Sequence, residues 1–185
     1  MATEGWGKQG TWEETENFLG KVIGVSVGAD AVELGSIRKW LEAKEFYAPI
    51  HSDEKAAVEA GFKDIVAPHT MAFTYGLPAY FTPEKPLEKM GDTPRQIPVP
   101  VIFDVPAPCK LSFATSIDIE FYEDMYVGDK ISCTHKLIDI THKTLSVGEG
   151  AFLTQEDIYV NQRGDKVARV LLVIFRFNPP VKSKL

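Results

Sequence analysis

Histidine is the side chain best suited to acid–base chemistry near neutral pH, and this chain has four of them. One of these, His51, directly follows Pro49-Ile50, and the nearest preceding carboxylate is Glu45. An imidazole and a carboxylate that converge on one water molecule can act on it as general acid and base. His51 and Glu45 are therefore the candidate catalytic pair. The alternatives are a structural loop histidine and a solvated carboxylate on a helix surface.

Three predicted helices position these residues. An apolar stripe at Ile37, Trp40 and Leu41 predicts a helix over 37–48 with Ser36 as its N-cap. Asp53 is placed to cap a second helix, which Gly61 ends. Residues 69–80 carry almost no charge, so we expect a helix there that is buried on nearly every side.

The remainder of the chain predicts an antiparallel sheet. Strands are expected over 20–34, 117–121, 130–140, 143–160 and 167–177. The first should be an edge strand with a bend, the second half-buried, and the last central. A tight connection is predicted at Thr141-His142, and a hairpin loop at 161–165. The other histidine of this region, His135, is expected to be a strand-face residue.

One sheet wrapped around one buried helix is the hotdog arrangement, so we predict a single α+β hotdog domain. The predicted boundaries are an arm over 1–19, the hotdog domain over 20–178 and a tail over 179–185. A proline-rich stretch at 82–108 interrupts the domain, and we expect it to form a functional flap or partner-contacting loop.

Composition excludes several classes of function. The net charge is −6 and the basic residues are scattered, which argues against nucleic acid or an anionic membrane as the main partner. The apolar run 167–177 is too short to span a bilayer, and the N-terminal residues show no export signal. The two cysteines, Cys109 and Cys133, form no framework of disulfides and show no metal-binding spacing with histidine. We expect a soluble, cytoplasmic protein without a metal or redox cofactor.

Several segments together resemble one known family, the MaoC-like dehydratases, which include R-specific enoyl-CoA hydratases. The segments that carry the resemblance are Pro49-Ile50-His51-Ser52-Asp53-Glu54, Gly61-Phe62, Ile65-Val66-Ala67-Pro68 and Phe121 to Asp129. The similarity is greatest to the branch that resembles the N-terminal dehydratase region of fungal fatty-acid synthase, and it covers residues 20–178. It implies a hotdog fold and a CoA or carrier-protein thioester as substrate.

The resemblance also implies site residues, with two departures. His51 matches the family histidine, but Phe46 stands where the family has its catalytic Asp. Pro68 stands where a family glycine donates a backbone N–H to the thioester carbonyl, so His69 or Thr70 would have to donate instead. Tyr75 is expected in the core or lining the acyl tunnel.

The implied activity is reversible hydration of an enoyl thioester, by a homodimer or by a heteromer with a second hotdog subunit. An alternative is a non-catalytic acyl-binding subunit whose partner carries the intact pair. A third possibility, a hotdog thioesterase, ranks last because residues 69–77 contain no carboxylate.

Overall fold

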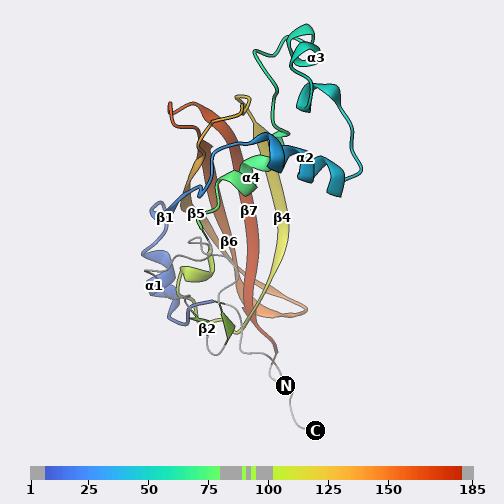
Figure 1. Cartoon of the computed structure of the whole chain (residues 1–185). Coiled ribbons are helices and arrows are strands. Elements are labelled where there is room, and N and C mark those ends of the chain that lie inside the picture. Colours follow the sequence, from blue (N-terminus) through green and yellow to red (C-terminus); the bar gives the residue numbers. More distant parts are fainter. Residues whose placement is uncertain (1–6, 80–88, 91–92, 95–101, 181–185) are drawn as a thin grey trace.

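A five-stranded antiparallel sheet is the scaffold of the molecule (Figure 1), in the order β1-β5-β6-β7-β4. The computed structural model describes residues 7–79, 89–90, 93–94 and 102–180. The strands of the sheet are β1 (Val22–Val27), β4 (Leu111–Phe121), β5 (Ser132–Leu145), β6 (Gly148–Val160) and β7 (Lys166–Asn178). The short strands β2 (Lys89–Met90) and β3 (Thr93–Pro94) pair separately. The predicted hotdog architecture is confirmed: β1 lies at one edge, and β7 has a neighbour on both sides.

The helices lie at two ends of the sheet. They are α1 (Trp12–Glu16), α2 (Leu34–Ala43), η1 (Pro49–His51), α3 (Glu54–Glu59), η2 (His69–Met71), α4 (Ala72–Tyr75) and η3 (Ile102–Asp104). Figure 1 shows α2 and α3 projecting beyond one end of the sheet, and we call residues 34–61 the overhang. None of the described helices is long and apolar enough to cross a membrane.

The central helix is shorter than the sequence predicted. The segment starting at His69 forms one 3-10 turn and then a single α-helical turn that ends at Gly76. A Cβ on Gly76 would come within 2.6 Å of the Tyr159 ring, and Pro78 disfavours helical backbone in the residue before it. The predicted helix over 69–80 was therefore wrong for residues 76–79, which are not helical. Tyr80 lies outside the described residues. The prediction of burial all round was also wrong, because Leu77 is exposed.

Two apolar clusters cover the inner face of the sheet. The central helix contributes to the first cluster only. Residues of α2, η2 and α4 form the first cluster with residues of β5, β6 and β7. The second cluster is built from η3 and the sheet, and Trp12 and Phe18 pack against it. The N-terminal segment thus supplies part of the core. Its helix α1 carries a capping box between Thr11 and Glu14, and Thr15 donates to the carbonyl of Pro106.

Buried Arg176 of β7 ties the same end of the molecule together. Its guanidinium donates to the carbonyls of Val105 and Lys8, and burial lowers its pKa, which the thiol of Cys109 partly opposes. The end of the proline-rich stretch and the N-terminal segment are therefore both held to strand β7.

Three local predictions need correction. The turn expected at Thr141-His142 is absent, because β5 continues to Leu145 and turns at Ser146-Val147, where Gly148 has a φ of 145°. Strand β4 is not half-buried. Ile117 is 57% exposed, and Ile119 and Phe121, at the same period-two positions, are exposed too. The described parts of the chain leave this edge uncovered.

The third correction concerns α2, which begins at Leu34 with Glu33 as N-cap. The hydroxyl of Ser36 donates to the Glu33 carboxylate instead of capping the helix. In contrast, the predicted cap of α3 is confirmed, since Asp53 accepts from the Ala56 N–H. The predicted hairpin loop is also confirmed, with Gly164 at a φ of 87°.

Candidate functional site

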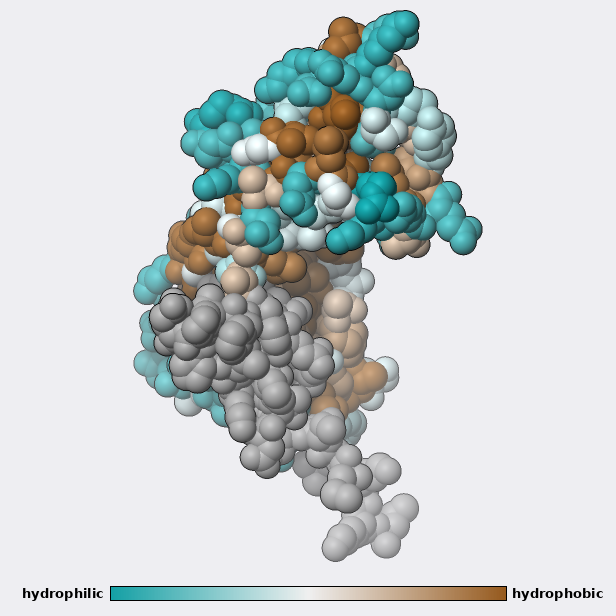
Figure 2. All heavy atoms as spheres, viewed as in Figure 1, coloured by the Kyte–Doolittle hydropathy of each residue, from teal (hydrophilic) through white to brown (hydrophobic). Residues whose placement is uncertain are grey.

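A cavity of about 490 Å³ lies in the overhang, along α2 and between it and η1. Its lining residues are Leu34, Gly35, Arg38, Leu41, Glu42, Glu45, Phe46, Tyr47, His51 and Ser52. The structure thus brings the two candidate catalytic residues, His51 and Glu45, to one cavity. Figure 2 shows apolar surface gathered on this part of the molecule and bordered by hydrophilic residues.

His51 is oriented by the backbone of the segment before the central helix. Its Nδ1 lies 2.6 Å from the Val66 carbonyl oxygen, and the Val66 N–H donates to the carbonyl of Ile50. A carbonyl can only accept, so Nδ1 carries the proton of the hydrogen bond. The Nε2 of a neutral ring then holds the free lone pair, which is the arrangement that a general base requires.

Glu45 has an unusual backbone. The helix α2 ends in a Schellman arrangement, in which the N–H of Phe46 donates to the Leu41 carbonyl and the N–H of Glu45 donates to the Glu42 carbonyl. The position that glycine usually fills in this arrangement is occupied by Glu45 at a φ of 50°. This bend turns the chain at the end of α2 toward η1. The Glu45 side chain lines the cavity and is exposed to solvent.

Phe46, which replaces the family aspartate, also borders the cavity. Its side chain is half exposed, and its ring centroid lies 6.2 Å from that of His51. The apolar ring therefore lies in the neighbourhood of the imidazole. The cavity has two carboxylates, Glu45 at the preceding position and Glu42, which is ion-paired with Arg38.

The start of the central helix forms a separate group of residues outside this cavity. Pro68 is buried and caps η2, and Thr70 is exposed in its first turn. The N–H groups of His69 and Thr70 have no acceptor within the helix because they belong to its first turn. The structure does not bring Tyr75 to the cavity: it is buried beneath α2, and its hydroxyl donates to the Glu33 carbonyl and accepts from the Glu33 N–H.

His69 has a carboxylate partner that the sequence did not reveal. Its Nε2 lies 3.0 Å from Oδ1 of Asp124, and the Tyr126 hydroxyl donates to the other carboxylate oxygen. The His69 ring also contacts Phe121 at the end of β4, at 5.4 Å between centroids. A gap of 55 residues separates His69 from Asp124, so no local spacing could have signalled the pair.

The architecture defines a class of protein before any comparison is made: a hotdog domain with a helical overhang that carries an imidazole and a carboxylate. Comparison with known families agrees. Residues 18–170 match the family model described as "FAS1-like, dehydratase domain region". The chain therefore belongs to this family, and the predicted MaoC-like relationship is confirmed.

Individual relatives give the same result. The chain is 29% identical over 164 residues to a "Probable enoyl-CoA hydratase alpha subunit" of Thermomonospora curvata, covering 88% of this chain and 50% of the relative. The chain thus spans about half the length of that curated relative.

Two solved structures share the fold. The ChsH1-ChsH2 complex of Mycobacterium tuberculosis superposes with a TM-score of 0.68 at 21% identity, over 92% of this chain and 93% of the other. The MaoC-like dehydratase of Rhodospirillum rubrum superposes with a TM-score of 0.56 at 18% identity, over 88% of this chain and 94% of the other.

Proposed function

We propose that this chain is a subunit of an acyl-thioester hydratase, which adds water reversibly across the double bond of a 2-enoyl-CoA or a 2-enoyl carrier-protein thioester. The observation that carries the proposal is that His51 and Glu45 line one cavity in a chain of a dehydratase family. The name of the Thermomonospora relative supports the same reaction.

The chemistry follows from the positions of the two side chains. The lone pair on Nε2 of His51 accepts a proton from the attacking water, while the oxygen of that water bonds to C3 of the enoyl thioester. The Glu45 carboxylate accepts the second O–H of the water and so orients it. A proton then returns to C2, which completes the addition of one water molecule. The backbone N–H groups of His69 and Thr70 are the proposed donors to the enolate oxygen, and this role requires one thioester to reach both the cavity and the separate helix start.

We further propose that a second hotdog subunit pairs with this chain along β4. The outer edge of β4 has no strand partner within the described residues, and exposed Phe113, Ile117, Ile119 and Phe121 lie along it. An exposed apolar edge of this length invites strand pairing. The name "alpha subunit" and the two-chain complex among the structural neighbours support a heteromer.

A second candidate function is a non-catalytic acyl-binding subunit whose partner supplies the complete acid–base pair. The observation that favours it is Phe46 beside His51 at the position of the family aspartate, together with Pro68 in place of the N–H donor. In that case the chain shapes the acyl site and the partner performs the proton transfers.

Hydration of a panel of short and medium 2-enoyl-CoAs, followed by loss of the enoyl absorbance, tests both candidates. We expect His51→Ala to lower turnover about 100-fold or more, and Glu45→Gln to lower it at least tenfold. The matched control is Glu59→Gln, on the exposed face of α3 next to Lys55, which should leave turnover unchanged.

The remaining outcomes are decisive as well. If the chain alone binds acyl-CoA but does not hydrate it, the acid–base pair must come from a partner subunit, which supports the second candidate. The hydratase proposal fails if the purified chain neither binds acyl-CoA nor turns it over, alone or with a co-purified hotdog partner.

A further inference from the structure

A buried group of chemically active side chains lies on the inner face of the sheet, outside the cavity of the overhang. Cys133 and His135 are two residues apart on β5, so both face the same side. Asp157 of β6 pairs directly opposite His135 in the register. All three residues are buried, and the Cys133 sulfur, a ring nitrogen of His135 and a carboxylate oxygen of Asp157 lie within 4.8 Å of one another.

These atoms have nearly the spacing of metal ligands. His135 Nδ1 is 2.7 Å from Asp157 Oδ1 and 3.8 Å from Cys133 Sγ. In a tetrahedral zinc site, zinc–ligand bonds of about 2.0–2.3 Å place neighbouring ligand atoms about 3.3–3.6 Å apart. An ion therefore needs the imidazole and carboxylate to separate by roughly half an ångström and the thiol to approach slightly.

Each of two candidate ligands is also held by a second residue, as metal ligands usually are. Ser26 Oγ lies 3.1 Å from Nε2 of His135, and the Gln155 amide donates to Asp157 at 2.7 Å. The amide oxygen of Gln155 in turn accepts the backbone N–H of Ile102 in η3. The surroundings thus fix the orientation of both the imidazole and the carboxylate.

Ser26 has a particular advantage as the partner of the imidazole. Without an ion, Nδ1–H of His135 donates to Asp157, and Nε2 accepts the Ser26 hydroxyl proton. When Nδ1 binds an ion, the ring proton moves to Nε2 and is donated to Ser26 Oγ. A hydroxyl can do either, so the site accommodates both tautomers.

We propose that Cys133, His135 and Asp157 form a binding site for a divalent zinc-like cation. A sulfur, nitrogen and oxygen ligand set is the one that Zn²⁺ prefers. Binding replaces the thiol proton, which is released to solvent, and the Tyr159 hydroxyl beside Cys133 or a water molecule completes the coordination. Because the site is enclosed, the ion is structural: it joins β5 to β6 directly and steadies η3 through Gln155.

Co²⁺ titration of the chelator-treated, full-length chain tests the site, since thiolate ligation to Co²⁺ gives a near-ultraviolet charge-transfer band. We expect the band to saturate at one Co²⁺ per chain, to disappear when Zn²⁺ is added, and to be absent from Cys133→Ser. Cys109→Ser is the matched control, because Cys109 is also a buried free cysteine but belongs to no such cluster among the described residues. It should retain the band in full.

A second variant separates ion binding from a purely structural hydrogen-bond network. Ser26→Ala keeps all three ligands but removes the partner of Nε2, so Zn²⁺ should bind about 10- to 100-fold more weakly. Zn²⁺ should also raise the melting temperature of the wild type and not that of Cys133→Ser. The proposal is overturned if the wild type gives no charge-transfer band, or if Cys133→Ser gives the same band.

Discussion

Two histidine–carboxylate pairs in this molecule have nearly the same geometry but very different surroundings. His69 and Asp124 lie 3.0 Å apart at the start of the central helix, with their side chains 39% and 30% exposed. His135 and Asp157 lie 2.7 Å apart on the sheet, with their side chains 4% and 10% exposed. The first pair is partly in water, and the second is enclosed by core residues.

Solvent decides what each pair can do. Water screens the exposed pair, so its contribution to stability is small and its members remain accessible to a substrate. The buried pair has no water to replace a lost partner, and either residue alone would be a costly buried polar group. The exposed pair is therefore suited to chemistry and the buried pair to holding strands or an ion.

The largest effect is expected for the buried pair. Asp157→Ala leaves the Nδ1–H of His135 and the amide of Gln155 without their acceptor. We expect the free energy of unfolding to fall by about 3–5 kcal/mol, as measured by urea denaturation at neutral pH. A loss below about 1 kcal/mol would show that the buried pair is no more important to stability than a surface pair.

An intermediate effect is expected for Asp129, a carboxylate without a histidine. Burial would raise its pKa, but hydrogen bonds from Arg163, the Tyr126 N–H and Gln162 outweigh burial and lower it. A lowered folded-state pKa stabilises the fold above the ordinary value of 3.8, and this stability is lost as the pH falls below it. Asp129→Asn should cost about 2 kcal/mol at pH 7.

Acid denaturation provides the check on Asp129. Below about pH 4 the wild type should lose stability more steeply than Asp129→Asn, because only the wild type has this group to protonate. Parallel curves for the two proteins would contradict the assignment.

The smallest effect is expected for the exposed pair. Asp124→Ala should lower the free energy of unfolding by no more than about 1 kcal/mol, with a smaller loss at high salt. Urea denaturation beside Asp157→Ala gives the direct comparison. Equal losses in the two variants would mean that burial does not distinguish the pairs.

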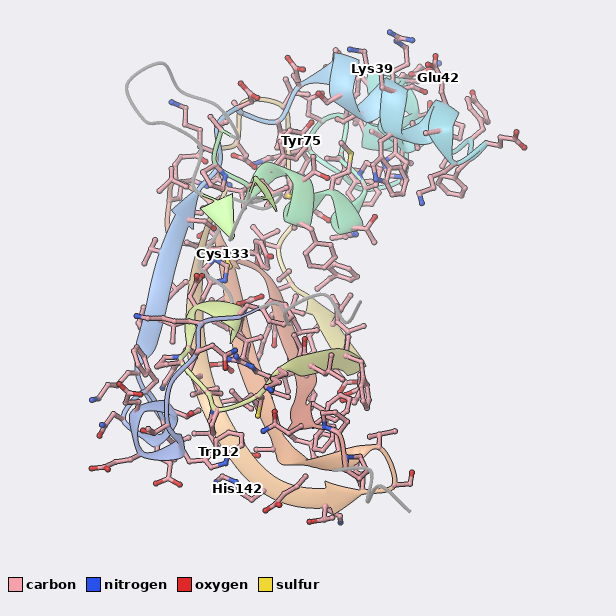
Figure 3. The ribbon with its side chains drawn as sticks, turned by 90° about the horizontal axis from the view of Figure 1, so that it is seen from below. Trp12, Lys39, Glu42, Tyr75, Cys133 and His142 are labelled. Carbon is pink, nitrogen blue, oxygen red and sulfur yellow. The ribbon has the colours of Figure 1, made fainter. Side chains whose placement is uncertain are left out.

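The fold was predictable because its signals are local. Asp53 is an N-cap whatever lies elsewhere in the chain, and Gly164 marks the hairpin between the last two strands. The incorrect prediction of a turn at Thr141-His142 also has a local cause. These polar residues lie in the part of β5 that has exposed side chains. Trp12 of α1 packs on His142 there, as Figure 3 shows, at 4.7 Å between ring centroids.

The site was less predictable because its partners are distant in sequence. His51 and Glu45 line one cavity, and their catalytic role stays a prediction. The positive φ of Glu45 has no sequence signal comparable to a glycine. The Cys133-x-His135 spacing carries no metal signature in the sequence, but on a strand two residues at this spacing share a face. Figure 3 shows Cys133 on the sheet, and it belongs to the same apolar cluster as Tyr75 of α4. Its neighbour Asp157 could be identified only from strand register.

The hydrogen bond between Arg176 and the Lys8 carbonyl joins residues 168 positions apart. During synthesis, Lys8 therefore leaves the ribosome long before its partner exists. Trp12 and Phe18 pack on the second cluster, whose members lie between Ile102 and Ile174, so they also wait for later parts of the chain. Until then the nascent chain exposes aromatic side chains that attract chaperones or aggregate. Lys8 can therefore reach its final place only after Arg176 has been made.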